Sequence, residues 1–257
     1  MSMLIRGAVA CIALSFTIVT QAAEPKFRAI AFYNTNVEKA HQKFAKDAVE
    51  FYGTLATKDN FVFESTTDWS KLNTENLKNY DVVLWLNDSA HGEDQKIAFQ
   101  RYMENGGGWL GFHVSGYNDK NTKWPWFVQF MGDAVFNNNN WPIGPDKVKV
   151  IVDTTDHPAT MRMPKSYDSP PNEFYQWVPS PRLNESVKVL MTLDPSNYPL
   201  GKKATLTGGD TPIAWTNTRY RMLYTVLGHG DDNGVLASPT ANLFFEDALL
   251  WVGESGK

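Results

Sequence analysis

Short apolar segments of strand character alternate with segments of helical character through the first half of the chain. Residues 27–33 form an apolar run typical of a strand, and the apolar residues of 37–55 then recur at helical spacing, with Asn36 as the expected cap. Further strands are expected at 61–64, 81–86 and 109–114, and a helix at 93–105. Strands separated by helices need crossover connections, and wholly apolar strands suit a sheet covered on both faces. The pattern therefore predicts an α/β fold with a doubly wound, mostly parallel sheet.

The second half of the chain is less regular but continues the same architecture. A short helix is expected around residues 124–130, a polar surface loop at the asparagine run 137–140, and strands at 147–152, 187–193, 212–215 and 220–227. The chain ends in a helix that Ser238 is expected to cap, with Pro239 in the first turn and apolar residues on one side. The length left after the N-terminal segment suits one α/β domain and no linker interrupts it, so we expect a single domain.

The N-terminal segment has the layout of a cleaved secretory signal. Residues 1–6 carry one positive charge, residues 7–19 are apolar, and small residues follow to Ala23. The apolar run is short for a membrane span, so we expect cleavage after Ala22 or Ala23, a domain at 24–257, and a secreted or periplasmic protein with no membrane span after processing. The single cysteine, Cys11, leaves with the signal. Thiol chemistry is therefore excluded for the mature protein.

The charge balance argues against one class of partner. The chain has 24 basic and 28 acidic residues, and no cluster of lysines or arginines that would follow a phosphate backbone. Nucleic acid is therefore not an expected partner. The oligomeric state stays open.

Polar side chains follow several of the expected strands at the point where each strand ends. Tyr33 follows the first strand, Asn87 and Asp88 follow the third, His113 ends the fourth, and His229 stands between two glycines after the last. In open α/β sheets, ligands bind in the crevice at the carboxyl ends of the strands. These residues are therefore the first candidates for a functional site.

His113 is the candidate with the most informative surroundings. Gly111 stands two residues before it, and a small residue there permits a tight turn from strand to helix that exposes the side chain. A histidine in such a turn acts as a general base, a proton donor or a metal ligand more often than as a nucleophile. The alternative is a histidine that is hydrogen-bonded under a loop and has only a structural role.

Five motifs in order carry a resemblance to a known family. They are Glu104 to His113 (ENGGGWLGFH), Asp156 to Thr160 (DHPAT), Asn172 to Tyr175 (NEFY), Pro212 to Trp215 (PIAW) and Leu227 to His229 (LGH). With these motifs the sequence resembles the ThuA-like (trehalose-utilisation) family, which is similar in fold to the class I glutamine amidotransferases. The resemblance covers nearly all of the chain after the signal segment.

The resemblance implies a flavodoxin-like sheet and a function in sugar metabolism. His113 would stand where the amidotransferases keep their catalytic cysteine, which excludes glutamine hydrolysis by a thiolate. The family's setting implies glycoside substrates, in particular disaccharides oxidised to 3-keto forms. A base that removes the acidified proton beside the ketone and an acid that assists the departing oxygen would cleave such a glycoside. We expect His113, Glu173 and His229 to converge for this chemistry, as a hydrolase or lyase.

Other residues receive weaker expectations. Six are candidates for contact with a sugar: Tyr33, Asn87, Asp88, Tyr117, Tyr175 and Trp215. Glu173 and Tyr175 also admit structural interpretations as buried, hydrogen-bonded groups. His41, on the inward-facing row of the first helix, is expected to be a satisfied core histidine, with a position at the crevice as the alternative, and His157 is expected to cap a loop. A divalent metal held by His113, His229 and a carboxylate stays possible, although no ligand spacing fixes it.

Two further functions stay open beside the enzyme. One is a carbohydrate-binding or accessory protein in which the same crevice holds a sugar and breaks no bond. The other is a structural partner in an oxidoreductase complex, which would present a large exposed apolar patch.

Overall fold

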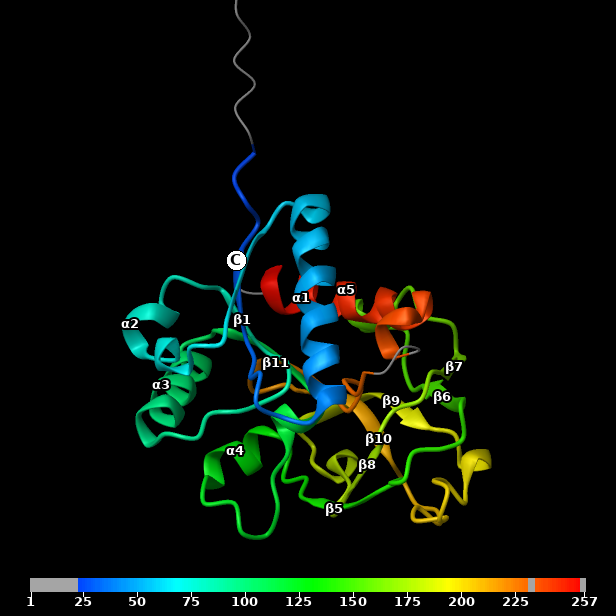
Figure 1. Cartoon of the computed structure of the whole chain (residues 1–257). Helices are drawn as coiled ribbons and strands as arrows, with labels where there is room; N and C mark the ends of the chain where they lie inside the picture. The colour runs from blue at the N-terminus through cyan, green and yellow to red at the C-terminus, as the bar shows by residue number, and fades with distance from the viewer. Residues whose placement is uncertain (1–22, 231–233, 255–257) are drawn as a thin grey trace, which may run out of the picture.

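A mixed sheet of nine strands runs through the part of the chain that the computed structural model describes, residues 23–230 and 234–254 (Figure 1). Its strands are β1 (Arg28–Phe32), β2 (Val62–Thr66), β3 (Val82–Trp85), β4 (Gly108–Phe112), β6 (Val148–Val152), β7 (Ser166–Ser169), β9 (Val187–Leu193), β10 (Pro212–Asn217) and β11 (Arg221–Thr225). They lie in the order β2-β1-β3-β4-β11-β10-β9-β6-β7. Of the expected secretory signal, only Ala23 lies within the described residues.

The parallel part of the sheet is built as the alternation of strands and helices predicts. β1 pairs in parallel with β2 and β3, and β4 pairs in parallel with β3 and β11. From β11 outward the pairing is antiparallel. Only residues 218–220 connect β10 to β11, and so short a link forms a hairpin. The predicted α/β fold with a mostly parallel central sheet is confirmed, and antiparallel strands extend it on one side.

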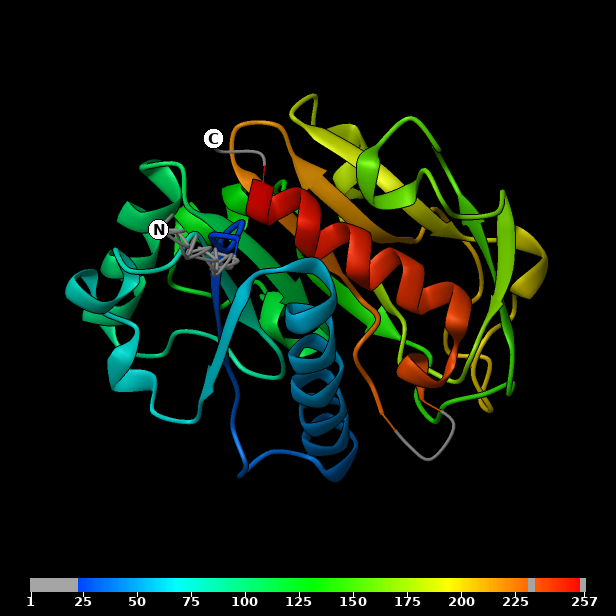
Figure 2. The same ribbon diagram turned by 90° about the horizontal axis from the view of Figure 1, so that it is seen from above.

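Helices cover both faces of the parallel strands. The helices are α1 (Lys39–Asp59), α2 (Thr74–Leu77), α3 (Glu93–Glu104), α4 (Pro125–Phe130) and α5 (Pro239–Glu254). On β4, Phe112 packs against Phe44 of α1 and Phe245 of α5, and Figure 2 shows these two helices on one side of the sheet. Trp109 points the other way, against Phe99 of α3 and Phe130 of α4. Both faces of β4 are therefore buried, which explains its continuous apolar sequence.

The helix ends depart from the predictions in one place. Ser238 does cap α5, since its Oγ accepts a hydrogen bond from Ala241 N at 3.3 Å. Asn36, in contrast, does not cap α1. That helix begins at Lys39, with Glu38 in the cap position and no side-chain cap hydrogen bond. The loop before α1 is held instead by Asn34, whose Oδ1 accepts from Asn36 N at 2.8 Å.

The asparagine run is a strand, so the expected surface loop at 137–140 was wrong. β5 (Phe136–Asn139) pairs with β8 (Tyr175–Trp177) in an antiparallel two-stranded sheet within the described residues. Asparagine has low strand propensity, but pairing with a partner strand and side-chain hydrogen bonds override propensity here. Asn138 Nδ2, for example, donates to Thr205 O at 2.8 Å. This small sheet brings Asn139 and Tyr175 to the end of β4.

No helix in the described ranges is long and apolar enough to cross a membrane.

Candidate active site

Three histidines and a glutamate converge at the carboxyl edge of the parallel strands. His113 follows β4, His229 follows β11, Glu173 precedes β8, and His41 lies in the first turn of α1. His113 Nε2 lies 3.2 Å from Glu173 Oε2. The ring centroid of His41 lies 5.0 Å from that of His113 and 5.2 Å from that of His229. The structure thus brings together His113, Glu173 and His229, and adds His41 to them.

The backbone of His113 adopts a conformation that few residues other than glycine accept. Its φ is 47°, in the left-handed region, which costs a non-glycine residue of order 1–3 kcal/mol. Tyr224 stabilises the turn, because its hydroxyl donates to His113 O at 2.6 Å. Gly111 was expected to permit the tight turn, but its role is to make room for a neighbouring side chain. A Cβ there would lie 2.1 Å from the indole of Trp109. It leaves room for that side chain, while His113 itself makes the turn.

The ring of His113 is oriented to exchange one proton at Nε2. Nδ1 donates to Val226 O at 2.9 Å, and a carbonyl oxygen can only accept, so this nitrogen carries a proton. In the neutral ring, Nε2 accepts from the Tyr175 hydroxyl at 3.2 Å; in the charged ring, Nε2 donates to Glu173. Each protonation state therefore has a partner within the site.

Asparagine side chains hold Glu173. Asn139 Nδ2 donates to Glu173 Oε1 at 2.6 Å, and Asn172 Nδ2 donates to Glu173 O at 2.9 Å. Burial alone would raise the pKa of Glu173, but the hydrogen bond and the electrostatic interaction with His113 lower it overall. The carboxylate is therefore ionised at neutral pH. Its side chain keeps 12% of its surface exposed, whereas that of His113 is fully buried.

Asn172 also places His229. Its Oδ1 accepts from the backbone nitrogens of Gly228 and His229, at 3.2 and 3.0 Å. Gly228 is required here for close approach, because a Cβ would lie 2.7 Å from that of His113. The loop after β11 can therefore pass directly over the turn that carries His113.

Burial keeps His41 and His229 neutral. Burial, followed by the charges of His113 and His229, lowers the pKa of His41 to about 3. Burial and the charge of His113 likewise lower the pKa of His229. In the described part of the chain, the Nε2 atoms of His41 and His229 are buried without a hydrogen-bond partner. Both rings therefore keep a polar nitrogen facing the site.

The expectation that His41 is a satisfied core histidine was wrong. The residue is buried as expected, but its Nε2 faces the site and has no hydrogen-bond partner among the described residues. The helical spacing of apolar residues predicted that His41 lies on the inward face of α1. Spacing alone does not show that the first turn of α1 lies at the carboxyl edge of the sheet, beside the site. His157 behaves as predicted, since its Nδ1 accepts from Ala159 N at 3.2 Å and caps the short helix there.

The proposed sugar contacts divide into buried and accessible residues. Trp215 was wrongly predicted as a contact, because it is fully buried and its Nε1 donates to Met131 O at 3.0 Å. Asn87 is buried too, and its Nδ2 donates to Asn34 O and His41 O, so it positions α1 instead of meeting a ligand. Tyr175 lies inside the site, where burial and the charge of Glu173 raise its pKa.

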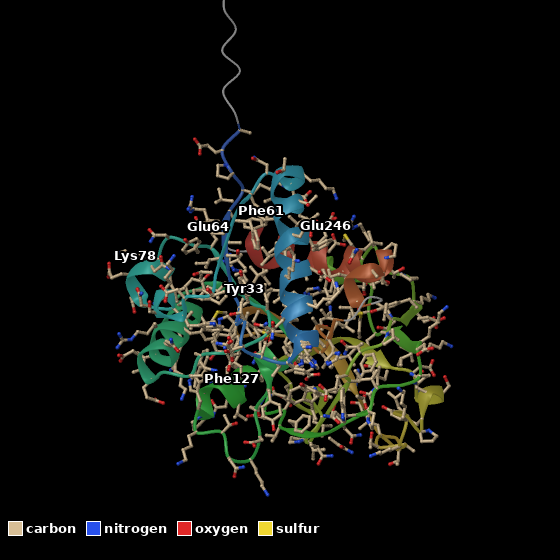
Figure 3. The ribbon with its side chains drawn as sticks, viewed as in Figure 1. Tyr33, Phe61, Glu64, Lys78, Phe127 and Glu246 are labelled. Atoms are coloured by element: carbon tan, nitrogen blue, oxygen red, sulfur yellow. The ribbon has the colours of Figure 1, made fainter. Side chains whose placement is uncertain are left out.

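The remaining candidates for sugar contact, Asp88 and Tyr33, lie outside the cluster of histidines and Glu173. Asp88 accepts from Asn34 Nδ2 at 2.9 Å and pairs with the exposed His91 at 2.8 Å. Tyr33 directly follows β1 (Figure 3). With residues such as Lys39 and Gln42, it lines a groove along α1. That groove does not include the histidines or Glu173.

Two exposed aromatic side chains flank the cluster. Tyr117 is 41% exposed, and its ring centroid lies 6.4 Å from that of Tyr175. Trp141 is 50% exposed, and its centroid lies 6.4 Å from that of His229. The sequence predicted Tyr117 as a sugar contact but not Trp141, because nothing in the sequence around Trp141 indicates that its side chain is exposed. Exposed rings of this kind are the surfaces on which sugars stack.

The fold resembles that of several solved structures. A putative ThuA-like protein from Bacteroides uniformis is 46% identical, with 94% of this chain and 98% of that chain covered and a TM-score of 0.86. A putative ThuA-like protein from Parabacteroides merdae is 16% identical over 91% of each chain, with a TM-score of 0.69. A putative GMP synthase protein from Thermoplasma acidophilum is 10% identical over 88% of this chain and 94% of that chain, with a TM-score of 0.50. The last likeness extends to the fold alone, which resembles that of the class I glutamine amidotransferases.

A family model also matches most of the chain. The model described as ThuA, trehalose utilisation, matches residues 28–252. No match was found among curated proteins. The extent of the family match and the identity to the Bacteroides uniformis protein show that this chain belongs to the ThuA family, which is linked to trehalose utilisation.

Proposed function

We propose that this protein is an enzyme that cleaves 3-keto disaccharides by elimination, with Glu173 as the base. The observation that carries the proposal is the contact between Glu173 and His113 at 3.2 Å, beside two neutral histidines. The family's link to trehalose utilisation supports a disaccharide substrate.

The division of roles follows from exposure. The side chain of His113 is fully buried, so the partly exposed carboxylate of Glu173 is the group of the pair that can touch a substrate. Glu173 would take the proton from the carbon between the ketone and the anomeric carbon. The electron pair left behind forms a double bond to the anomeric carbon, whose bond to the glycosidic oxygen breaks. His113 stabilises the result, since its Nε2 lies within reach of the proton that Glu173 has gained.

The departing oxygen needs assistance from a second group. His41 and His229 lie beside the pair, with ring centroids 5.0 and 5.6 Å from that of His113. An electrophile at this position would stabilise the oxygen as it leaves as an alcoholate, which becomes an alcohol by taking up a proton from water. Tyr117 and Trp141 are suited to hold the two sugar rings on either side, because both are exposed.

The test is turnover of a 3-keto disaccharide, followed by proton NMR, with the wild-type protein and the Glu173→Gln variant. Glutamine keeps the shape and the Oε1 that accepts from Asn139, but it cannot take a proton. We expect a rate loss of about 10²-fold or more. His91→Gln, which changes an exposed histidine paired with Asp88, is the matched control and should keep full activity.

A carbohydrate-binding protein without turnover is the second candidate, and the exposed rings of Tyr117 and Trp141 favour it equally. Broadened ligand signals without product, unchanged in Glu173→Gln, would establish binding in place of catalysis. We also propose that the protein is secreted or periplasmic. A mature N-terminus at Ala23 or Glu24, determined by mass spectrometry of the exported protein, would support this.

A further inference from the structure

We propose that Glu38, His41 and His229 form a binding site for a divalent transition-metal ion beside the Glu173–His113 pair. The proposal deepens the proposed function, and the part of it that concerns catalysis rests on that function. Metal binding itself depends only on the three side chains.

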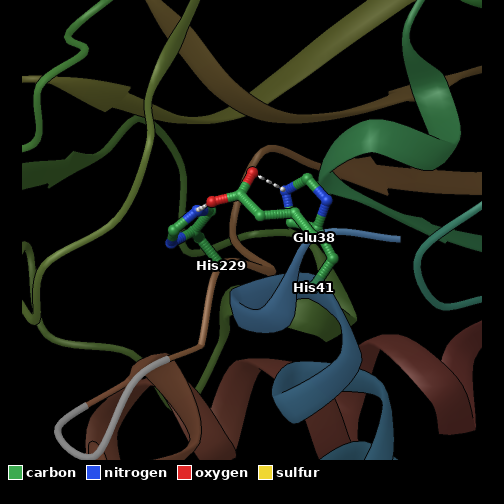
Figure 4. Close-up of side chains that lie close together, drawn as sticks. All are labelled: Glu38, His41 and His229. Carbon is green, nitrogen blue, oxygen red and sulfur yellow. Dashed lines mark ion pairs between the residues drawn. The ribbon is translucent and has the colours of Figure 1, made fainter. Parts of the chain in front are cut away.

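The three side chains present their ligand atoms to one another. Glu38 Oε2 lies 4.0 Å from His41 Nε2, and Glu38 Oε1 lies 3.6 Å from His229 Nε2. Figure 4 shows the carboxylate between the two rings. One ligand atom from each residue fits within a mutual separation of 4.8 Å. Ligands at about 2.0–2.1 Å from a tetrahedral ion lie roughly 3.3 Å apart, so a small inward movement completes the site.

Glu38 is the residue that can make this movement. Its side chain is 50% exposed, whereas the side chains of His41 and His229 are 11% and 7% exposed. The two rings are fixed by packing and by the backbone around them. Asn87 Nδ2 donates to His41 O at 3.2 Å, and Asn172 Oδ1 accepts from His229 N at 3.0 Å. These contacts fix the backbone from which the two rings project.

A metal ion would also give a partner to the two buried imidazole nitrogens. Across residues 23–230 and 234–254, neither His41 Nε2 nor His229 Nε2 has a hydrogen-bond partner, although both atoms are buried. A buried polar group without a partner destabilises the folded protein. Both rings are neutral at pH 7 because burial lowers their pKa values, and a neutral ring is the form that binds metal.

A second trio of possible ligands, His41, His113 and Glu173, is a poorer site. His113 Nε2 and Glu173 already contact each other, and Tyr175 and Asn139 take up the capacity that remains on them. An ion there would have to displace these partners. The trio with Glu38 requires no such displacement, and it leaves the base of the proposed reaction unligated.

Two imidazoles and one carboxylate select the kind of ion. Imidazole nitrogen suits zinc, iron, cobalt or nickel, whereas calcium and magnesium prefer oxygen ligands alone. Three protein ligands leave positions for oxygen atoms of a substrate. An ion here would supply the electrophile that assists the departing oxygen.

The test is titration of the metal-free mature protein with Co²⁺, followed by calorimetry and by the visible absorption of the bound ion. We expect one saturable site per chain in the wild-type protein. Glu38→Gln should weaken binding at least tenfold, and His41→Gln and His229→Gln should abolish it. Glu50→Gln, on the exposed face of the same helix, and His91→Gln are matched controls and should bind as the wild type does.

Absence of saturable binding, or equal binding by all the variants, would overturn the proposal. Near-UV circular dichroism verifies that each variant is folded. If a histidine variant fails to fold, Glu38→Gln decides alone, because its side chain is half exposed and its loss leaves the core intact.

The same samples separate the metal site from the proposed function. Co²⁺ binding without turnover of a 3-keto disaccharide would uphold the site and reject the reaction. Turnover that survives a chelator in a protein that binds no Co²⁺ would uphold the reaction and reject the site.

Discussion

His113 Nε2 and Glu173 Oε2 lie 3.2 Å apart, although 60 residues separate them in the chain. The two residues meet because the turn after β4 and the segment before β8 are joined through Val226 O and Asn172. His113 Nδ1 and Asn172 Nδ2 both donate to that carbonyl, at 2.9 and 3.2 Å. Hydrogen bonds to Val226 O therefore fix His113 and Asn172, and Nε2 of His113 stays directed at the Glu173 carboxylate.

The first prediction concerns this pair as a unit. His113→Asn should fold, because asparagine tolerates the left-handed φ of 47°, but it should lose activity by about 10²-fold or more. The double variant with Glu173→Gln should lose hardly more than either single variant, because residues that act together are not additive. Initial rates of product formation measure both effects. Losses that multiply would mean that the two side chains act independently.

The fold could be predicted well because it depends on local patterns. The continuous apolar run 82–86 predicted a strand buried on both faces, and β3 is buried at every residue. Likewise, the strand expected at 187–193 is β9 without change. The asparagine run was misread because its pairing partner, β8, lies 36 residues further along, and pairing of that kind leaves no local pattern.

The site could be predicted only in part. The ends of the strands and the family motifs pointed to His113, Glu173 and His229, which the structure brings together. Glu38 and Trp141 were not predicted, because charge or size alone does not tell whether a side chain faces a cluster built from distant segments. Trp215 was misassigned because the partner of its indole, Met131 O, comes from the end of α4.

The second prediction is a loss of stability in mild acid. The folded protein keeps His41 neutral with a pKa of about 3, whereas the unfolded chain binds a proton near pH 6.5. Between these values the unfolded state holds more protons, so the free energy of unfolding falls as the pH falls, by up to about 1.4 kcal/mol per pH unit for this histidine. His229 and His157, whose pKa values are also lowered, act in the same direction.

Urea unfolding of the metal-free protein at pH 7, 6 and 5 measures this dependence. His41→Gln should show a shallower slope over that range, since one of the proton-binding groups is gone. Glu173 does not obscure the comparison, because its pKa is lowered and its contribution is lost only as the pH falls through that lowered value. An unchanged slope in His41→Gln would mean that this histidine is not neutral in the folded state.

The third prediction tests the exposed aromatic rings. Trp141→Ala and Tyr117→Ala should each raise KM for a glycoside by roughly threefold to tenfold, the equivalent of about 0.5–1.5 kcal/mol of stacking, with little change in kcat. Thermal stability should stay nearly constant because both side chains are exposed. Leu183→Ala, which changes a side chain that is 76% exposed and lies outside the cluster, is the control. An effect on kcat alone would place these rings in the chemistry instead of in binding.

The fourth prediction concerns Asn172 as a positioning residue. Its side chain is fully buried and makes four hydrogen bonds, to the backbone of Glu173, Val226, Gly228 and His229. Asn172→Ala would leave several buried backbone groups unpaired, so the free energy of unfolding should fall by about 2–4 kcal/mol. Asn121→Ala, which removes an exposed asparagine, should cost little.

Asn172→Asp separates a positioning role from a purely stabilising one. Aspartate still accepts from the nitrogens of Gly228 and His229, but it cannot donate to Val226 O or Glu173 O. The loop that carries His229 should therefore stay in place while the backbone of Glu173 loses the hydrogen bond from Asn172. If Asn172 positions the base, kcat should fall further than KM rises, and the pH dependence of kcat should shift. A variant that is destabilised but has the wild-type pH profile would show that Asn172 contributes to stability alone.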